Sequence, residues 1–221
     1  MTGPASFHVL TDTSAARSLR RLIGDRRWAR RQHGAQFIRV LGTSRGMSTG
    51  WSTDPRRNAV FAVWSSNDAL AAFVASGATG HPSPGVTGQH FALRLISGHG
   101  AWGGEPLLDL ITAADDGHTG EVAVVTRANV RLLAWPQFVH QGRLVSDSAK
   151  TEHGLVDLLG FGEAPIGPVG TFSRWTSPHA VQDFHAQNSA HREASRRERS
   201  GGWFRTELFA RFAATDQGPS G

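Results

Sequence analysis

Two stretches, Phe61-Ala62-Val63-Trp64-Ser65-Ser66 and Phe172-Ser173-Arg174-Trp175-Thr176-Ser177, decide the fold of this 221-residue chain. In both stretches Phe, Trp and Ser recur at the same spacing, and a further phenylalanine follows at the same distance, at Phe73 and Phe184. The two copies lie 111 positions apart. A period of this length indicates a duplicated structural unit and not a solenoid of short repeats.

Matching segments flank the two copies in the same order. Upstream, His33-Gly34 and His153-Gly154 each precede an apolar run. Downstream, Phe91-Ala92-Leu93 resembles Phe209-Ala210-Arg211. Three matches in one order indicate that most of the chain is a single unit present twice.

Each unit has the element order strand, helix, strand, strand, helix, strand. In the first unit Leu19, Leu22, Ile23 and Trp28 recur at helical spacing and predict the apolar face of a helix. We expect strands at 7–10, 36–41, 59–64 and 90–96 and helices at 14–31 and 66–74, then strands at 121–126, 155–161, 169–175 and 207–213 and helices at 135–149 and 177–200. This order predicts an α+β fold of tandem ferredoxin-like repeats, of the dimeric α/β-barrel type, which form an intramolecular pseudo-dimer.

The expected domain boundaries follow from the repeat. They are 1–104 for the N-terminal half, 105–120 for a linker, 121–213 for the C-terminal half with the candidate site, and 214–221 for a flexible tail. Glycines around Trp102 mark the beginning of the linker. In such a pseudo-dimer we expect a large apolar pocket between a sheet and its covering helices.

The composition excludes several classes of site. Hydrophobic residues make up 39% of the chain and charged residues 19%, which is typical of a globular protein. There is no cysteine, so disulfides, zinc-thiolate centres, iron–sulfur clusters and cysteine nucleophiles are excluded. No apolar run approaches the about 18 residues of a membrane span, and the first residues do not resemble a secretory signal, so we expect a cytoplasmic protein.

The net charge of +5 comes almost entirely from arginine, because Lys150 is the only lysine. Seven arginines lie between Arg17 and Arg31, and four between Arg192 and Arg199. Such clusters can bind nucleic acid or an anionic membrane surface. Both lie in helical patterns where arginine is the polar residue, and no aromatic recognition motif accompanies them, so we expect no nucleic-acid partner.

Histidines distinguish the second unit from the first. Its longest expected helix contains His185 and His191, whereas the corresponding helix of the first unit has no histidine and ends sooner. The two histidines are six positions apart, about 120° around a helix, so they are poorly placed to bind one metal together. A single histidine facing the sheet could be an axial haem ligand. The alternative is a surface histidine among arginines.

The block from His191 to Phe212 resembles the C-terminus of spheroidene monooxygenase-like proteins, most closely in Gly201-Gly202-Trp203-Phe204-Arg205-Thr206-Glu207-Leu208-Phe209-Ala210-Arg211-Phe212. Other segments agree, namely 39–43, 100–104, 125–128, 160–165 and 171–175, so the resemblance covers most of the chain, from about Phe37 to Phe212. This family is associated with haem-dependent oxygenation, and its named member adds oxygen to a carotenoid. The sequence departs from the family pattern at Arg205-Thr206 and Ser195, so a carotenoid substrate does not follow.

The resemblance implies haem b as cofactor, with His191 as the proximal ligand and therefore the metal-binding residue. Trp203, Arg205, Phe209 and Arg211 are expected around the haem, with Arg211 paired either with Glu207 or with a haem propionate. Arg45, in a glycine-rich loop, is the candidate catalytic group on the distal side, where a guanidinium could reach an oxygen or a carboxylate. A solvated loop arginine is the alternative for Arg45.

Three functions stay open. The first is a haem-dependent monooxygenase acting on a small or lipophilic organic substrate, with an external electron donor. The second is a haem-dependent dehydratase or nitrogen–oxygen chemistry catalyst on the same scaffold. The third is a non-catalytic carrier of haem or of a lipophile. Association of two chains into a homodimer also stays open. Neither a serine-nucleophile elbow nor a phosphate-binding glycine loop is present, because Ser173 lacks flanking glycines and the 98–104 segment lacks the required lysine and following helix.

Overall fold

The computed structural model describes residues 2–29, 31–44, 53–79, 85–131, 134–135, 153–163, 167–187 and 204–220. Its strands are β1 (Ala5–Asp12), β2 (Ala35–Ser44), β3 (Thr53–Trp64), β4 (Val86–Gly100), β5 (Val122–Val130), β6 (Leu155–Gly162), β7 (Pro168–Trp175) and β8 (Phe204–Ser220). Its helices are α1 (Ala15–Ile23), α2 (Asp25–Ala29), α3 (Asn67–Ala75) and α5 (Pro178–Gln187), with a 3-10 turn, η1, at Leu107–Leu110. Most of the helix expected at 135–149, and the last part of the one expected at 177–200, lie outside the described residues. Within the described part, no helix is long and apolar enough to cross a membrane.

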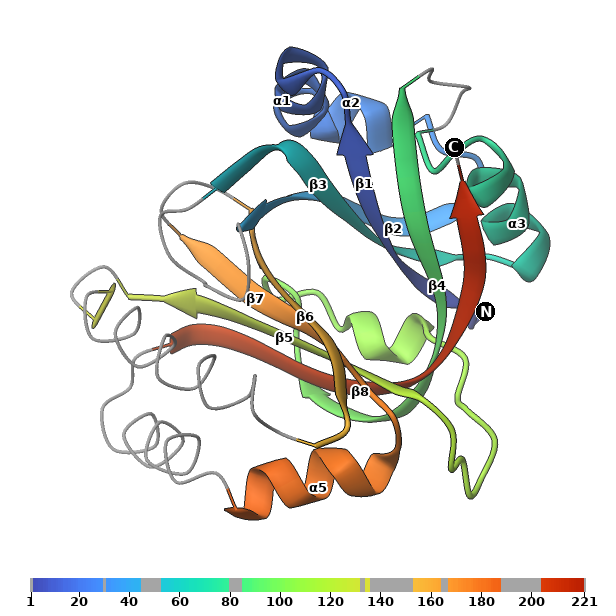
Figure 1. The fold of residues 1–221 in the computed structure, drawn as a ribbon, viewed down its shortest axis with the longest axis vertical. Helices are drawn as coiled ribbons and strands as arrows, with labels where there is room; N and C mark the ends of the chain where they lie inside the picture. The colour runs from blue at the N-terminus through green and yellow to red at the C-terminus, as the bar shows by residue number, and fades with distance from the viewer. Residues whose placement is uncertain are drawn as a thin grey trace.

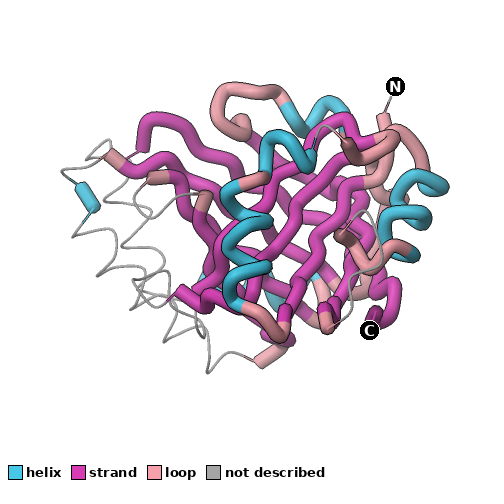
Figure 2. Tube along the Cα trace, turned by 90° about the horizontal axis from the view of Figure 1, so that it is seen from above, coloured by secondary structure: helices cyan, strands magenta, loops and turns pink. Residues whose placement is uncertain are grey.

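Eight antiparallel strands close into a barrel in the order β1-β3-β2-β6-β7-β5-β8-β4. The first unit contributes β4-β1-β3-β2 and the second contributes β8-β5-β7-β6, which is the same order copied strand for strand. The units meet where β4 pairs with β8 and where β2 pairs with β6. Figure 2 shows the strands at the centre and the helices on the outside. The predicted fold class, tandem ferredoxin-like repeats in a pseudo-dimer, is confirmed.

The two units match in detail at the glycine that precedes their second strands. Gly34 and Gly154 both have positive φ angles, +76° and +96°. A Cβ added to Gly34 would lie 2.6 Å from the Cβ of Ala69, and one added to Gly154 would lie 2.7 Å from that of Ala180. Conformation and space therefore both require glycine, in both copies.

Aromatic side chains from both units fill the barrel interior. The ring of Phe7, on β1, stacks on the ring of Phe172, on β7, with centroids 4.0 Å apart and planes 2° apart. Neither ring is more than 1% exposed. The same cluster contains buried residues of both units, among them Phe37, Phe61, Phe91, Phe161, Leu208 and Phe212. This interior is one core shared by the two units, so a site for a large ligand is expected on the outer faces of the sheets.

The segment after β4, expected to be only a linker, contributes to this core. Trp102 is 1% exposed, and its ring lies nearly parallel to those of Phe61 and Phe161, with centroid distances of 4.9 and 6.1 Å. Leu107, at the start of η1, and Ile111 are buried in the same cluster. Glycines suggested a simple connection here, but the segment places a tryptophan inside the barrel.

Helix α1 turns its polar side chains toward the barrel. The carboxylate of Asp12, at the end of β1, is fully buried and accepts hydrogen bonds from Arg17 at 2.9 Å and from Arg21 at 3.4 Å. Arg21 also donates to the side-chain oxygen of Asn58 at 2.8 Å, and Asn58 in turn donates to the Ser18 hydroxyl at 2.6 Å. These buried polar contacts fix the rotation of α1 about its axis.

Leu19 and Ile23 consequently face solvent, with exposed fractions of 53% and 79%. The prediction that they belong to the buried face of the helix is wrong for these two residues, although Leu22 and Trp28 do pack against the core. The expected single helix is also divided, because Gly24 caps α1 with a hydrogen bond from its N–H to the carbonyl of Arg20 at 2.8 Å.

Strand β8 continues well beyond its expected end. Asp216 lies opposite Phe91 and Ser220 lies opposite Gly88 in the ladder with β4. The prediction of a flexible tail from residue 214 is therefore wrong, because β4 is long enough to provide backbone partners for this segment. Figure 1 shows α1, α2 and α3 at one end of the molecule and α5 at the other.

Candidate functional site

The outer face of the C-terminal sheet carries a row of side chains that the strand register brings together. Thr171 of β7 lies opposite Thr126 of β5, which lies opposite Phe209 of β8. Phe209 in turn lies opposite His99 of β4. The two threonine hydroxyl oxygens are 2.7 Å apart, and the His99 ring stacks on Phe209 with centroids 5.6 Å apart. The threonines and the phenylalanine are only half-buried, so this part of the face combines small hydroxyl groups with one accessible aromatic ring.

Arg211 lies two residues beyond Phe209 and therefore on the same face of β8. Its guanidinium carbon is 5.4 Å from the centre of the Phe209 ring. Its Nε atom is buried and has no hydrogen-bond partner in the described part of the protein. Glu207 is exposed, and no ion pair joins it to Arg211 among the described side chains. A buried guanidinium N–H without a described partner can donate a hydrogen bond to a carboxylate or a phosphate of a ligand.

Helix α5 covers the neighbouring part of the same face. The ring of Phe184 is 5.1 Å from that of Trp175, and Val181 is 1% exposed beside them. The indole N–H of Trp175 donates to the Ser173 hydroxyl at 2.9 Å. Phe209 packs against the edge of this cluster. Trp175 and Phe184 are thus core residues, as their copies in the first unit suggest, and the Ser173 hydroxyl is held by an indole.

The strand ladders make His8 and His90 of the first unit the copies of Thr126 and Phe209 in the second. This register corrects the sequence match between the fourth strands. Phe91 points into the barrel interior, whereas Phe209 points outward. The predicted equivalence of Phe91 and Phe209 is therefore wrong by one residue, and a shift of one residue in a strand exchanges the two faces.

The first unit fills the equivalent position completely. The Nδ1 atoms of His8 and His90 are 2.9 Å apart, and Nε2 of His8 lies 2.7 Å from the Ser6 hydroxyl. That hydroxyl also accepts a hydrogen bond from the indole N–H of Trp64 at 2.8 Å. The His8 ring packs edge-on against Phe73 of α3, 5.1 Å away. Burial lowers the pKa of both histidines. The pKa of His8 lies well below the ordinary value, and the neighbouring His90 lowers it further.

The predicted site residues have different outcomes. Phe209 and Arg211 lie together on the outer face of the C-terminal sheet. Arg205 lies in β8, but its side chain is outside the described residues, and so are Arg45, His191 and Trp203. Among the described side chains there is no cluster of three or more metal-ligating groups. The roles assigned to these residues stay predictions.

Sequence reasoning did not single out Thr126, Thr171 or His99. The alternation of side chains in strand 122–130 could have placed Thr126 on the outer face with Val124. No sequence pattern gives the register between strands that are distant in the chain, and that register brings His99 of the first unit to Phe209 of the second.

The sequence is similar to curated proteins named spheroidene monooxygenase. The protein from Rubrivivax gelatinosus is 30% identical over 186 residues, which cover 81% of this chain and 68% of that protein. The protein from Cereibacter sphaeroides is 26% identical over 183 residues, covering 80% of this chain and 55% of the relative. The protein from Rhodobacter capsulatus is 31% identical over 121 residues, which cover 54% of this chain and 50% of that protein. The chain thus spans about half the length of these last two relatives. No family model matches the sequence.

Solved structures of two aldoxime dehydratases share the architecture. One superposes with a TM-score of 0.59 at 10% identity, over 96% of this chain and 81% of that one. The other, crystallised with butyraldoxime, superposes with a TM-score of 0.55 at 10% identity, over 96% of this chain and 79% of that one. At this identity the likeness concerns the fold alone, and it agrees with the barrel of two fused units.

Proposed function

Because this chain belongs to the spheroidene monooxygenase family, we propose that it is a haem-dependent monooxygenase acting on a small or lipophilic organic substrate. The observation that carries the proposal is the difference between the two units at one position. The first unit fills it with the buried pair His8 and His90. The second presents Thr126 and Phe209 beside Arg211, whose buried Nε has no partner among the described residues.

The described residues of this face fit a haem. A haem has a flat apolar body and two carboxylates, so its protein contacts need accessible apolar surface and a cationic donor. Phe209 offers a half-buried ring, and its neighbours Thr126 and Thr171 are small, half-buried side chains. Arg211 supplies the donor, because its buried Nε has no partner within the described part. His191, in the sequence that follows α5, would be the residue that binds the haem iron.

Bound haem would supply the iron at which oxygen is activated. The chain itself would position the cofactor and exclude water. Arg211 would hold one propionate through a charge-assisted hydrogen bond. Val124 and Phe209 would keep the sheet side of the site apolar. Arg45 would donate a hydrogen bond to the substrate or to a propionate. The substrate would be an organic molecule with enough apolar surface to enter such a site, and an external donor would supply electrons.

A dehydration on the same scaffold is the second candidate. Its support is the fold shared with the two aldoxime dehydratases. In that reaction the substrate would bind at the haem and no external oxygen would be consumed. Oxygen uptake in the presence of substrate and an electron donor therefore distinguishes the two candidates.

The visible absorption spectrum of protein supplied with haem tests the proposal. Wild type should show a Soret band that shifts when the iron is reduced, and His191→Ala should lose or shift this band. His179→Ala is the matched control, because His179 is an exposed histidine of α5 paired only with Asp183 among the described residues. A wild-type protein without a Soret band would exclude haem, and an unchanged spectrum for His191→Ala would exclude this ligand.

A further inference from the structure

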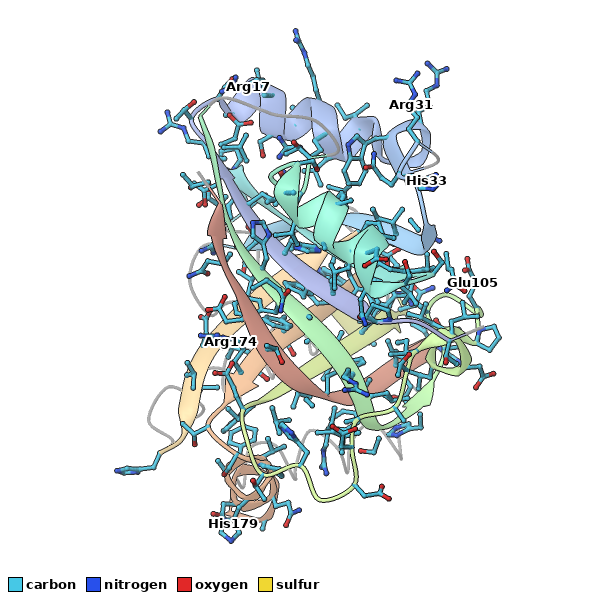
Figure 3. The ribbon with its side chains drawn as sticks, turned by 90° about the vertical axis from the view of Figure 1, so that its right-hand side faces the viewer. Arg17, Arg31, His33, Glu105, Arg174 and His179 are labelled. Carbon is cyan, nitrogen blue, oxygen red and sulfur yellow. The ribbon has the colours of Figure 1, made fainter. Side chains whose placement is uncertain are left out.

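One end of the molecule exposes apolar and basic side chains together. Leu19 and Ile23 lie one helical turn apart on α1, with exposed fractions of 53% and 79%. Arg20 is exposed on α1, Arg27 on α2, and Arg31 just after α2. We call these five residues the α1 patch. Figure 3 shows Arg17 and Arg31 along this segment, at the end of the molecule opposite His179 of α5.

The exposure of the two apolar residues is built into the packing of α1. Its inner face is held by Arg17 and Arg21, which bind the buried carboxylate of Asp12. Rotating the helix to bury Leu19 and Ile23 would break these contacts and leave a buried carboxylate without its cationic partners, which is strongly unfavourable. The orientation that leaves the apolar side chains in water is therefore fixed by the fold.

The arginines of the α1 patch have no acidic partners in the described structure. Asp12 is buried and already binds Arg17 and Arg21, and no ion pair joins Arg20, Arg27 or Arg31 to a described carboxylate. A partner that complements this surface must therefore carry negative charge. It must also accept two aliphatic side chains.

We propose that the α1 patch docks the protein onto an anionic lipid surface. Leu19 and Ile23 would enter the boundary between headgroups and acyl chains, and the arginines would contact lipid phosphates. Two exposed aliphatic side chains offer little apolar area for a stable protein interface, which covers about 800 Å² on each side. Nucleic acid would satisfy the arginines but would leave the aliphatic side chains in water. The proposal stands independently of the haem reaction.

Flotation of the full-length protein with vesicles tests this assignment. One set of vesicles contains phosphatidylcholine alone, and the other contains phosphatidylcholine with one part in three phosphatidylglycerol. Wild type should bind the anionic vesicles preferentially, and added salt should weaken the binding. Leu19→Ser combined with Ile23→Ser should lower the bound fraction by about tenfold while sensitivity to salt persists. Arg20→Gln combined with Arg27→Gln should remove the preference for anionic vesicles.

Val156→Ser is the matched control, because Val156 is 45% exposed on β6, in the other unit. It should bind vesicles as wild type does, and thermal melting should show all variants folded, since every changed side chain is exposed. Equal binding by wild type and by the Leu19/Ile23 variant would overturn the proposal. So would equal binding to both kinds of vesicle. Tight binding of a short DNA duplex without vesicle binding, or a dimer that the Leu19/Ile23 variant converts to monomer, would assign the α1 patch to another partner.

Discussion

His90 and Phe209 occupy the same position in the two halves of the barrel, on the outer face of the fourth strand, opposite the first strand of the unit. In the first half the side chain is a fully buried imidazole hydrogen-bonded to His8. In the second half it is a half-buried ring beside Arg211. The same position therefore holds a fully buried imidazole in one copy and a partly exposed phenylalanine in the other.

The first prediction concerns the number of haems. If the second unit binds haem as proposed, each chain should bind one haem and not two, because His8 and His90 fill the equivalent space in the first unit. The ratio of haem to protein, from a pyridine haemochrome assay and an amino-acid analysis, checks this. A ratio near two would mean that the first unit also binds haem, against the packing described.

Arg211→Gln should weaken haem binding by about 10- to 100-fold, because it removes a charge-assisted hydrogen bond to a propionate. Titration of apoprotein with haem measures the change. Arg94→Gln is the control, since Arg94 is half-exposed and its described partner is the exposed Asp115, 3.6 Å away. Equal affinity in the Arg211 variant and in wild type would remove Arg211 from the site, whereas the melting temperature of the apoprotein should change little in either variant.

The paired histidines should make the fold sensitive to acid. Burial lowers the pKa of His8 and His90, and Asp216 offsets this in part for His90. In the unfolded chain both titrate near the ordinary value of about 6.5, so below that pH the unfolded state binds more protons than the folded state. The free energy of unfolding should be independent of these groups above pH 7 and should fall as the pH decreases, by up to about 1.4 kcal/mol per pH unit for each histidine.

Urea unfolding between pH 8 and pH 5 measures this loss, and ring-nitrogen NMR provides a direct reading of the two imidazoles. Both rings should remain neutral in the folded protein at pH values just below the ordinary histidine pKa of about 6.5. Protonation of His8 near that ordinary value of about 6.5 would contradict the assignment, whatever the stability curve shows.

Gly34→Ala and Gly154→Ala should destabilise the protein to a similar extent. Each alanine would have to adopt a positive φ, at a cost of about 1–2 kcal/mol, and each Cβ would also meet the Cβ of an alanine within 2.7 Å. Gly77→Ala is the matched control, because Gly77 has φ +70° but open space around its Cβ position. Thermal or urea unfolding should show a larger loss for Gly34 and Gly154 than for Gly77, and equal losses in all three would mean that the close contact is easily relieved.

Phe172→Ala should lower the free energy of unfolding by about 3–5 kcal/mol, since it removes a buried ring and leaves a cavity. The lost contact with Phe7 joins the two units, so unfolding should remain a single transition that involves both. Calorimetry checks both points. Val156→Ala, at an exposed position, should change the stability by less than about 0.5 kcal/mol. Two separated transitions in wild type or variant would show that the units fold independently.

Much of the fold could be predicted because a duplicated sequence contains its own alignment. The Phe61/Trp64 and Phe172/Trp175 motifs give the third strands, and the helices with Phe73 and Phe184 follow at fixed distance. Alternation of apolar side chains then indicates the remaining strands. The prediction was wrong where a buried ion pair decides which face of a helix packs inward. Leu19 and Ile23 face water because Arg17 and Arg21, on the opposite side of the helix, form ion pairs with the buried Asp12.

The candidate site could be predicted only in part. Phe209 and Arg211 came from a resemblance to a family and lie on one face, but their neighbours Thr126 and His99 are set by the register of three strands. Nothing in the local sequence distinguishes a threonine beside a ligand from one in an ordinary strand. The incorrect equivalence of Phe91 and Phe209, which is wrong by one residue, has the same origin. Sequence similarity alone does not show which face of a strand a side chain occupies.

The aromatic interior of the barrel has a consequence for how the protein is made. The N-terminal half leaves the ribosome first, and the side chains that it contributes to the interior, Phe7, Phe61 and Phe91, have no cover until β5 to β8 have been synthesised. During that interval the nascent chain exposes a large hydrophobic surface. A truncated product ending in the 105–120 segment should therefore aggregate or bind chaperones when expressed alone, and supplying the C-terminal half as a separate chain should rescue it.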